Sequence, residues 1–268
     1  TFYRRITSQR LSMCRMHAIW GWMDTTKCGR ASHGNKGGGV RMVCVYRKEI
    51  KYVIPRKIFG RLQRLLDAVL ERDSHCRTDT YTVRSQYYDS LSDTDLRDNL
   101  SGVQEKRKIR VRIYSPEDRN AKLEYKCKNG SDGIKYSLPI SREEALCMQE
   151  SDYDFLMERM EPLAPRLYAK MTQQVYFPKT IVEYDRMAYV YPASDVRITY
   201  DSNLRATGNP YGLYDKEVGF VPLMDPAQGV LEVKYNDFFP AALKPLITDV
   251  NSVAEACSKY SRSRLMNL

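Results

Sequence analysis

Charged and apolar residues alternate along several segments of this chain, and segment 105–114 shows the pattern most clearly. Its even-numbered positions hold Lys106, Lys108, Arg110, Arg112 and Tyr114, and the odd-numbered positions between them include Ile109, Val111 and Ile113. Successive side chains of a β-strand point to opposite faces, so a period of two is typical of a strand. The segment is therefore predicted to be a β-strand with one basic face and one apolar face.

The same alternation recurs in five further segments, which are 45–52, 121–128, 181–190, 195–201 and 230–236. Their charged faces carry Arg47, Glu49 and Lys51; Lys122, Glu124, Lys126 and Lys128; Tyr184 and Arg186; Asp195, Arg197, Thr199 and Asp201; and Glu232, Lys234 and Asn236. Two architectures satisfy this pattern. One is an open sheet whose charged face is solvated, and the other is a closed barrel whose charged face lines the interior.

A glutamate stands two residues before a lysine in three of these segments, at Glu49, Glu124 and Glu232. A solvated face is expected to mix the two signs freely, whereas a tunnel around a long anion needs repeated cations with few carboxylates. In such a tunnel the carboxylates would bind a divalent metal ion and position the lysines. The recurrence therefore favours the tunnel. Asp201 fits either the lining of such a tunnel or a turn, because Ser and Asn follow it.

Helix signals separate some of the strands. Pro55 is predicted to open a helix that ends near residue 71, because apolar residues recur there at helical spacing. Ser141 and Glu144 form a capping-box pattern at the start of a predicted helix over 141–150. Further predicted helices lie within 152–171, after Pro240 and after Ser252. Many strands with few helices predict an α+β domain, and no apolar run approaches the length of a membrane span.

Residues 1–41 differ from the rest of the chain in charge. The formal net charge is +10, and residues 1–45 alone hold eight Lys and Arg against one acid. A glycine cluster at 34–39 is typical of a flexible junction. We therefore predict a basic, flexible N-terminal extension over 1–41 and a domain over 42–265. Four possible zinc ligands in the extension, Cys14, His17, Cys28 and His33, match no common zinc-finger spacing.

The seven cysteines include no C-x-x-C pair, which favours reduced thiols and a cytoplasmic location. His75, beside Cys76 in a polar stretch, is interpreted as functionally inert.

Eight short motifs occur in one order between residues 43 and 262. They are RKEIKY (47–52), QYYD (86–89), KIRVR (108–112), LEYK (123–126), VEYDR (182–186), VRITYD (196–201), LEVK (231–234) and SKY (258–260). Together they resemble the polyphosphate polymerase domain of the vacuolar transporter chaperone family (the VTC domain), within the CYTH or triphosphate tunnel metalloenzyme superfamily.

This resemblance implies an α+β fold built on an eight-stranded antiparallel β-barrel that forms a tunnel flanked by helices. It implies transfer of the γ-phosphate of a nucleoside triphosphate such as ATP to a growing polyphosphate chain, with Mn2+ or Mg2+ as cofactor. Nucleoside triphosphate and inorganic polyphosphate are thus the expected partners, and no nucleic acid is expected. A separate membrane-protein partner is compatible with the resemblance, since eukaryotic members of the family sit beside a transmembrane channel.

Site residues follow from the resemblance, motif by motif. The catalytic residues that grip phosphate would be Lys51, Arg110, Arg112, Lys126, Arg186 and Arg197. The substrate-binding residues would be Lys106, Lys108, Tyr184, Lys234, Ser258 and Lys259, and the metal ligand would be Glu232, with Glu124 as a second candidate. The superfamily opens with Glu-x-Glu-x-Lys, and Arg47 stands here in place of the first Glu, which favours polymerase over triphosphatase activity.

Three other functions remain open at this point. The same tunnel could hydrolyse triphosphate or polyphosphate, and it could bind polyphosphate without turnover, because phosphate binding and phosphoryl transfer use overlapping residues. The basic segment 1–41, with Trp20 and Trp22 for stacking, could bind nucleic acid instead.

Overall fold

A computed structural model describes residues 43–44, 48–76, 80–129, 132–236, 238–248, 250 and 257–266 of the chain. The predicted N-terminal extension, its Cys and His residues, Arg47 and the helix cap at Ser252 lie outside these residues. The description below concerns the unit Val40–Leu268 alone.

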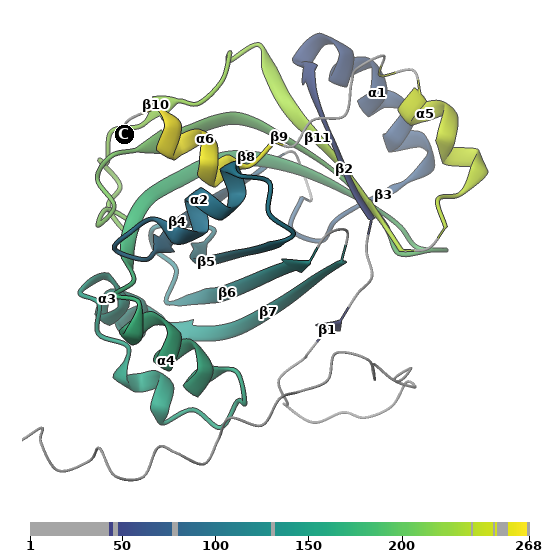
Figure 1. Cartoon of the computed structure of the whole chain (residues 1–268). Helices are drawn as coiled ribbons and strands as arrows, with labels where there is room; N and C mark the ends of the chain where they lie inside the picture. The colour runs from purple at the N-terminus through teal and green to yellow at the C-terminus, as the bar shows by residue number, and fades with distance from the viewer. Residues whose placement is uncertain are drawn as a thin grey trace, which may run out of the picture. The chain divides into compact units, whose positions relative to one another are not determined.

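One antiparallel sheet organises the described residues (Figure 1). Its strands are β1 (Val43–Cys44), β2 (Lys48–Pro55), β3 (Glu71–Arg72), β4 (Tyr81–Asp89), β5 (Glu105–Ile113), β6 (Asn120–Asn129), β7 (Asp132–Ser141), β8 (Phe177–Tyr191), β9 (Val196–Thr207), β10 (Val221–Pro222) and β11 (Gln228–Tyr235). They pair in the order β1-β7-β6-β5-β4-β8-β9-β11-β2, with β3 on β8 and β10 on β9. Each of the six predicted alternating segments contributes a strand, the first of them from Lys48 onward.

The two ends of this pairing path are consecutive in the sequence. β1 ends at Cys44 and β2 begins at Lys48, so the chain between them spans at most about 14 Å when fully extended. The sheet must therefore curve until its first and last strands come near each other. Among the described residues, β1 and β2 are not paired by hydrogen bonds. The observed architecture is therefore a curved antiparallel sheet, and closure of this sheet into the predicted barrel stays a proposal.

The apolar faces of the strands lie under helices, in two clusters. One joins the outer faces of β5, β6 and β7 to α3 (Arg142–Gln149), η1 (Asp154–Met157) and α4 (Ala164–Gln173), through residues such as Val111, Met148 and Leu167. The other joins β2, β9 and β11 to α1 (Arg56–Val69), η2 (Ala241–Leu243) and α5 (Lys244–Thr248). The charged faces of these strands therefore point the other way, into the concave side of the sheet.

Local contacts explain two of the helix positions. The capping box predicted at the start of α3 is present, with Ser141 and Glu144 each accepting from the backbone N–H of the other. α1 is held by the Phe59 ring, which stacks on Tyr200 with 3.7 Å between ring centroids. Gly229 makes room for that stack, because a Cβ at this position would lie 2.5 Å from the Tyr200 ring.

The last described helix, α6 (Lys259–Leu265), lies beside α2 (Thr94–Leu100) and against β8 (Figure 1). Its Tyr260 packs in a third cluster with Tyr87 and Tyr184. The Tyr260 hydroxyl donates to Asp89 Oδ2 at 2.6 Å. The same carboxylate accepts the backbone N–H of Ser90 and those of Asp95 and Leu96 in the first turn of α2. Asp89 thus fixes both helices, and with α6 it fixes the position of Lys259.

One buried ion cluster lies on the opposite face of the sheet, where the alternation predicts apolar residues. Glu183 of β8 pairs with Arg84 of β4 and Arg205 of β9. Arg84 also donates to the carbonyl oxygens of Leu213 and Asp215. The cluster therefore holds the loop after β9 against the sheet, which is a structural role.

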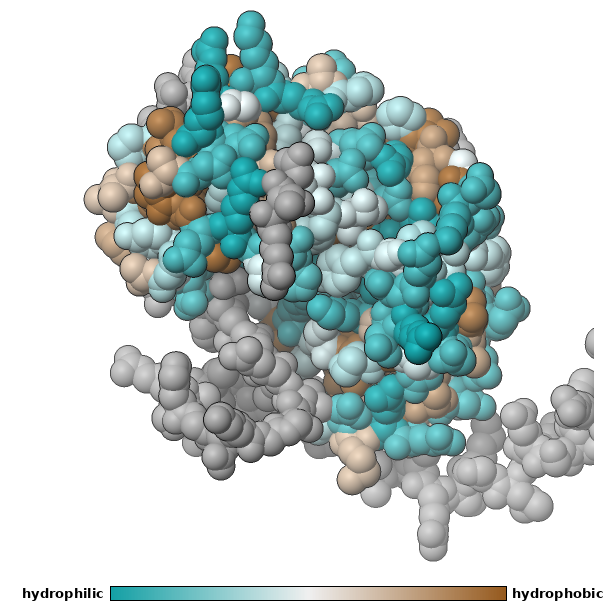
Figure 2. Space-filling view, turned by 180° about the vertical axis from the view of Figure 1, so that it is seen from behind, coloured by the Kyte–Doolittle hydropathy of each residue, from teal (hydrophilic) through white to brown (hydrophobic). Residues whose placement is uncertain are grey.

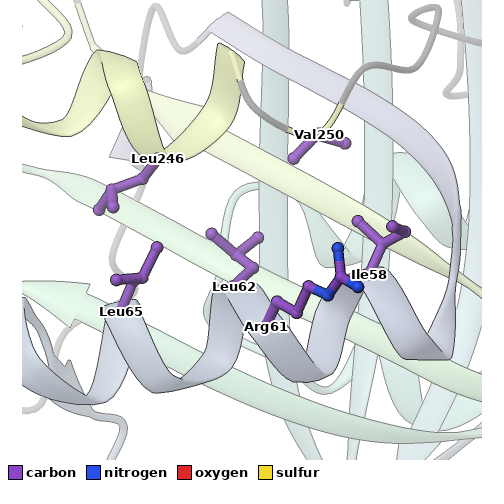
Figure 3. Close-up of a pocket in the computed structure, with 6 residues that line it drawn as sticks. All are labelled: Ile58, Arg61, Leu62, Leu65, Leu246 and Val250. Atoms are coloured by element: carbon purple, nitrogen blue, oxygen red, sulfur yellow. The ribbon is translucent and has the colours of Figure 1, made fainter.

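The outer surface is largely hydrophilic on the face seen in Figure 2, with hydrophobic residues gathered in a few places. A hollow of about 110 Å³ lies between α1 and α5, lined by Ile58, Arg61, Leu62, Leu65, Leu246 and Val250 (Figure 3). Arg61 is the single charged residue of its lining, so this hollow is a poor candidate for binding a polyanion.

Within the described residues, no helix is both long and apolar enough to span a membrane.

Candidate functional site

The charged faces of the strands meet on the concave side of the sheet, around four carboxylates. Nine cations surround Glu49, Glu124, Asp201 and Glu232; they are Lys51, Lys108, Arg110, Arg112, Lys126, Lys135, Arg186, Lys234 and Lys259. Cations therefore outnumber carboxylates about two to one. Such a surplus disfavours an empty interior and favours one that holds an anion with several charges.

Glu232 of β11 lies at the centre of the first group. Its carboxylate is 3.2 Å from Lys234 Nζ and 3.7 Å from both Lys51 Nζ and Arg186 Nη2. Lys51 stands opposite Glu232 in the register of β2 and β11, and it also pairs with Glu49 at 2.8 Å. Burial would raise the pKa of Glu232, but Lys234, a hydrogen bond with Glu49, and Lys51 lower that pKa well below its usual range.

Asp201 of β9 holds two cations of the second group. It accepts from Arg186 Nε at 2.6 Å and Nη2 at 2.8 Å, and it pairs with Lys259 Nζ at 2.7 Å. Burial would raise the pKa of Asp201, but Arg186 and Lys259 lower it to about 2. Asp201 is fully buried within its strand, so the alternative interpretation as a turn residue is wrong. Strand β9 continues past it to Thr207 through a register shift against β8.

Tyr184 of β8 lies beneath the same two cations. Arg186 Cζ is 5.1 Å and Lys259 Nζ is 4.7 Å from the centre of its ring. Burial would raise the pKa of the Tyr184 hydroxyl, but Arg186 and Arg112 outweigh it and lower that pKa. The hydroxyl is thus held in strongly positive surroundings.

Glu124 of β6 anchors the third group. Arg110 donates to it at 2.7 Å, Arg112 lies 3.7 Å away, and Lys135 of β7 forms a close ion pair with it. Arg110 also donates to the Tyr87 hydroxyl at 3.0 Å. Burial would raise the pKa of Glu124, but Arg110 and Arg112 lower it well below its usual range. Lys135 is a member of the site that sequence analysis did not find.

Two lysines of the interior have no carboxylate partner among the described residues. Lys108 donates to Ser258 Oγ at 2.9 Å, and burial together with Lys51 and Arg110 lowers its pKa to about 7. Burial, Arg110 and Lys234 lower the pKa of Lys126 well below its usual range. Lys126 lies on β6 and Lys234 on β11, which are far apart in the pairing order. Their interaction therefore crosses the interior.

Lys106 is the outlying member of the predicted set. It is half-buried near the start of β5, opposite Lys128 of β6. No ion pair involves it within the described part of the chain. Its charge nevertheless contributes to the lowered pKa of Lys108, so it lies at the end of the same cationic row.

A cavity of about 220 Å³ opens at one end of this interior. It is lined by Arg112, Arg186, Arg197, Glu124 and Lys135 of the site, together with Asp73, His75, Tyr81, Val83, Tyr114, Lys122 and Ser137. Arg197 donates to Asp73 Oδ2 at 2.7 Å and contacts the Tyr81 hydroxyl at 3.4 Å. The structure therefore brings together all the predicted cations except the outlying Lys106, and it adds Asp73, which lies in the loop after β3.

The donor set for a divalent metal is small. The described residues contain no group of three or more His, Cys, Asp or Glu that could hold a metal ion. Glu232 lies within hydrogen-bonding reach of Glu49. Thr199 stands opposite Glu232, and its buried hydroxyl has no hydrogen-bond partner among the residues that the structure describes. Mg2+ is commonly held by one or two carboxylates plus substrate phosphates and water. The oxygens around Glu232 fit that mode.

Comparison with known proteins gives one family. Residues 46–266 match the VTC domain. No curated protein shows significant sequence similarity to the chain.

Several solved structures resemble this chain in the path of the backbone. A candidate adenylate cyclase from Bacillus halodurans is 13% identical, with a TM-score of 0.47, and the match covers 81% of this chain and 97% of that one. A protein of Pyrococcus horikoshii is 13% identical with a TM-score of 0.43, covering 83% and 100%. A candidate adenylyl cyclase from Hippeastrum, described as having a dominant triphosphatase activity, is 14% identical with a TM-score of 0.48, covering 82% and 96%. Likeness at this level carries no information on activity.

Proposed function

The chain belongs to the VTC domain family, and from this premise we propose that it is a metal-dependent polyphosphate polymerase. It would transfer the γ-phosphate of a nucleoside triphosphate to the terminal phosphate of a polyphosphate chain held on the concave side of the sheet, with the nucleoside diphosphate as the leaving group. The observation that carries the proposal is the surplus of cations around the four interior carboxylates. Lys108 and Lys126, whose pKa values are lowered, are the two that most need an anion.

We propose that the sheet closes into a tunnel. Two observations support this: three residues join the strands at the two ends of the pairing path, and Lys126 of β6 interacts across the interior with Lys234 of β11. A tunnel open at both ends would let a growing chain leave opposite to the entry of nucleotide.

Phosphoryl transfer mainly requires a protein to position the phosphates and to neutralise their charge, because the protein itself contributes little covalent chemistry. Arg186 and Arg110 are held by buried carboxylates, at Asp201 and Glu124. Guanidinium groups fixed in this way do not have to reorganise when charge develops on the phosphate oxygens. Their remaining N–H groups, with the ammonium groups of Lys51, Lys126 and Lys259, would grip the phosphates.

We assign the metal to Glu232, with Glu49 and the Thr199 hydroxyl as neighbouring oxygens. Glu124, the second candidate, already pairs with Arg110, Arg112 and Lys135, so it suits a role in positioning those cations. Mn2+ or Mg2+ would supply further neutralisation of the phosphate charge when bound. Around it, Lys51 and Lys234 would hold the Glu232 carboxylate ionised and in place.

The decisive assay incubates the purified protein with ATP and Mn2+ or Mg2+ and measures polyphosphate chains and free phosphate separately. We expect long chains from the wild type, none from Glu232→Gln, and wild-type amounts from Glu117→Gln. Glu117 is a matched control because it lies on the surface, where its carboxylate contacts Lys216 and Ser115.

Other outcomes of the assay would replace this proposal. Free phosphate without chains would indicate a triphosphatase. Binding of polyphosphate without either product would indicate a binding module.

A further inference from the structure

Three aromatic rings meet at the rim of the cationic cavity. His75 comes from the turn after β3, Tyr81 begins β4, and Tyr114 follows the last residue of β5. Each pair of these rings has 5.9 Å between ring centroids, and all three line the cavity. The family resemblance assigns a role to none of them, and phosphate binding alone explains no aromatic cluster at this place.

The rings are in register with the arginines of the cavity. Tyr81 stands directly opposite Arg186 in the pairing of β4 and β8. Tyr114 is two residues beyond Arg112, so it lies on the same strand face and about 7 Å farther along the strand. A ligand whose phosphates contact Arg112 and Arg186 would therefore place its next group against these rings.

His75 is fixed although it is largely exposed. Its side chain is 60% exposed, yet Nδ1 hydrogen-bonds to Asp73 Oδ1 at 2.9 Å and its backbone N–H donates to the same oxygen at 3.0 Å. The other oxygen of Asp73 accepts from Arg197. One carboxylate thus orients both the exposed imidazole ring and an arginine of the cavity. The earlier interpretation of His75 as inert takes no account of this link.

We propose that His75, Tyr81 and Tyr114 form a stacking site for the base of the nucleoside triphosphate, with the triphosphate directed inward toward Arg112, Arg186 and Arg197. This inference rests on the proposed function, because it takes a nucleotide to be the phosphate donor. Lys122 lies over the Tyr114 ring at 5.2 Å, so the exposed imidazole face is the one most open to a base.

The chemistry of the site sets its specificity. Every nucleobase offers a π-face, so stacking discriminates poorly among bases. The affinity of the site should therefore differ far more between nucleotides and inorganic tripolyphosphate than between ATP and GTP.

Calorimetric titration with ATP, GTP and inorganic tripolyphosphate tests the inference. The variant is the double substitution His75→Ala, Tyr114→Leu, and the control is Tyr211→Leu, a half-exposed tyrosine outside the cavity. We expect the double variant to weaken ATP and GTP binding by about tenfold or more, the range of one lost base stack, while its affinity for tripolyphosphate stays within about twofold of wild type.

Two results would overturn the stacking site while leaving the phosphate site intact. One is an equal loss of affinity for ATP and for tripolyphosphate in the double variant, which would mean that the rings only support the cavity. The other is unchanged ATP affinity. A wild-type protein that binds neither ligand would instead remove the proposed function, and the stacking site with it.

Discussion

Arg186 and Asp201 face each other across β8 and β9 and form a two-pronged ion pair, with donor–acceptor distances of 2.6 and 2.8 Å. Asp201 is fully buried and Arg186 nearly so. Because Lys259 of α6 shares the same carboxylate, a single aspartate sets the positions of two cations, one on β8 and one on α6.

Replacing Asp201 by Asn should strongly destabilise the protein. The change leaves the buried charges of Arg186 and Lys259 without their anion, and loss of one partner of a buried pair typically costs about 3–5 kcal/mol. Urea denaturation measures this loss. Asp154→Asn is the control: Asp154 is exposed, so its change should stay within about 0.5 kcal/mol. A loss for Asp201→Asn no larger than that of the control would contradict the assigned role.

Adding tripolyphosphate should restore part of that stability. A bound polyanion would replace the missing carboxylate as the partner of Arg186 and Lys259, and ligand that binds only the folded state raises its stability. At the same free concentration of tripolyphosphate, the midpoint of urea denaturation should therefore rise more in Asp201→Asn than in wild type. An equal or smaller rise would show that the two cations do not reach the ligand.

The same carboxylate predicts how stability responds to acid. The folded-state pKa of Asp201 is lowered to about 2 from its ordinary value of 3.8. A group whose pKa is lowered on folding contributes stability above its unfolded pKa and loses that contribution as pH falls through the folded one. Asp201 should therefore cease to stabilise the fold between about pH 4 and pH 2. Denaturation midpoints measured in wild type and Asp201→Asn should converge across this window.

Lys108 predicts a second pH dependence of the same sign, near neutral pH. Its folded-state pKa is lowered to about 7 from 10.5, so between these values the unfolded chain binds more protons and its contribution to stability rises with pH. A bound polyanion would favour the charged ammonium, so tripolyphosphate binding at pH 8 should take up a proton. Calorimetry in two buffers of different ionisation enthalpy measures that uptake.

Lys108→Met is the matched variant for that experiment, because it keeps an unbranched side chain of similar length without a titratable group. It should abolish most of the proton uptake. Uptake that persists unchanged in the variant would assign it to another group, with Lys126 the next to test.

The alternation of residues predicted the strands and the direction of their faces, because burial under helices requires a continuous apolar side. It did not predict β7, although Ile134, Tyr136 and Leu138 alternate there, because glycine and proline interrupt the segment. Lys135 was missed with that strand. Asp73 could not be found either, since a lone loop aspartate has no periodicity and only the folded chain brings it to Arg197.

Gly229 and Gly60 should respond oppositely to alanine. A Cβ at Gly229 would lie 2.5 Å from the Tyr200 ring, whereas a Cβ at Gly60 has no heavy atom within 4 Å. Gly229→Ala should destabilise by about 1–3 kcal/mol, because the stack of Phe59 on Tyr200 must shift. Gly60→Ala, inside α1, should stabilise by about 0.5–1 kcal/mol. Urea denaturation of both variants checks the signs, and destabilisation by Gly60→Ala would contradict the open space around it.

Tyr260→Phe should loosen α6 and weaken phosphate binding together. The substitution removes the hydroxyl that donates to Asp89 at 2.6 Å, a bond to a charged acceptor typically worth about 1.5–3 kcal/mol. Because Lys259 precedes Tyr260 in the same helix, its ammonium should lose its fixed position beside Asp201. Hydrogen exchange should then speed up in α6 while α3 keeps its wild-type rates, and tripolyphosphate affinity should fall by several-fold. Faster exchange in α6 with unchanged affinity would show that Lys259 does not contribute to phosphate binding, whereas an affinity loss without faster exchange would place the Tyr260 hydroxyl itself in contact with the ligand.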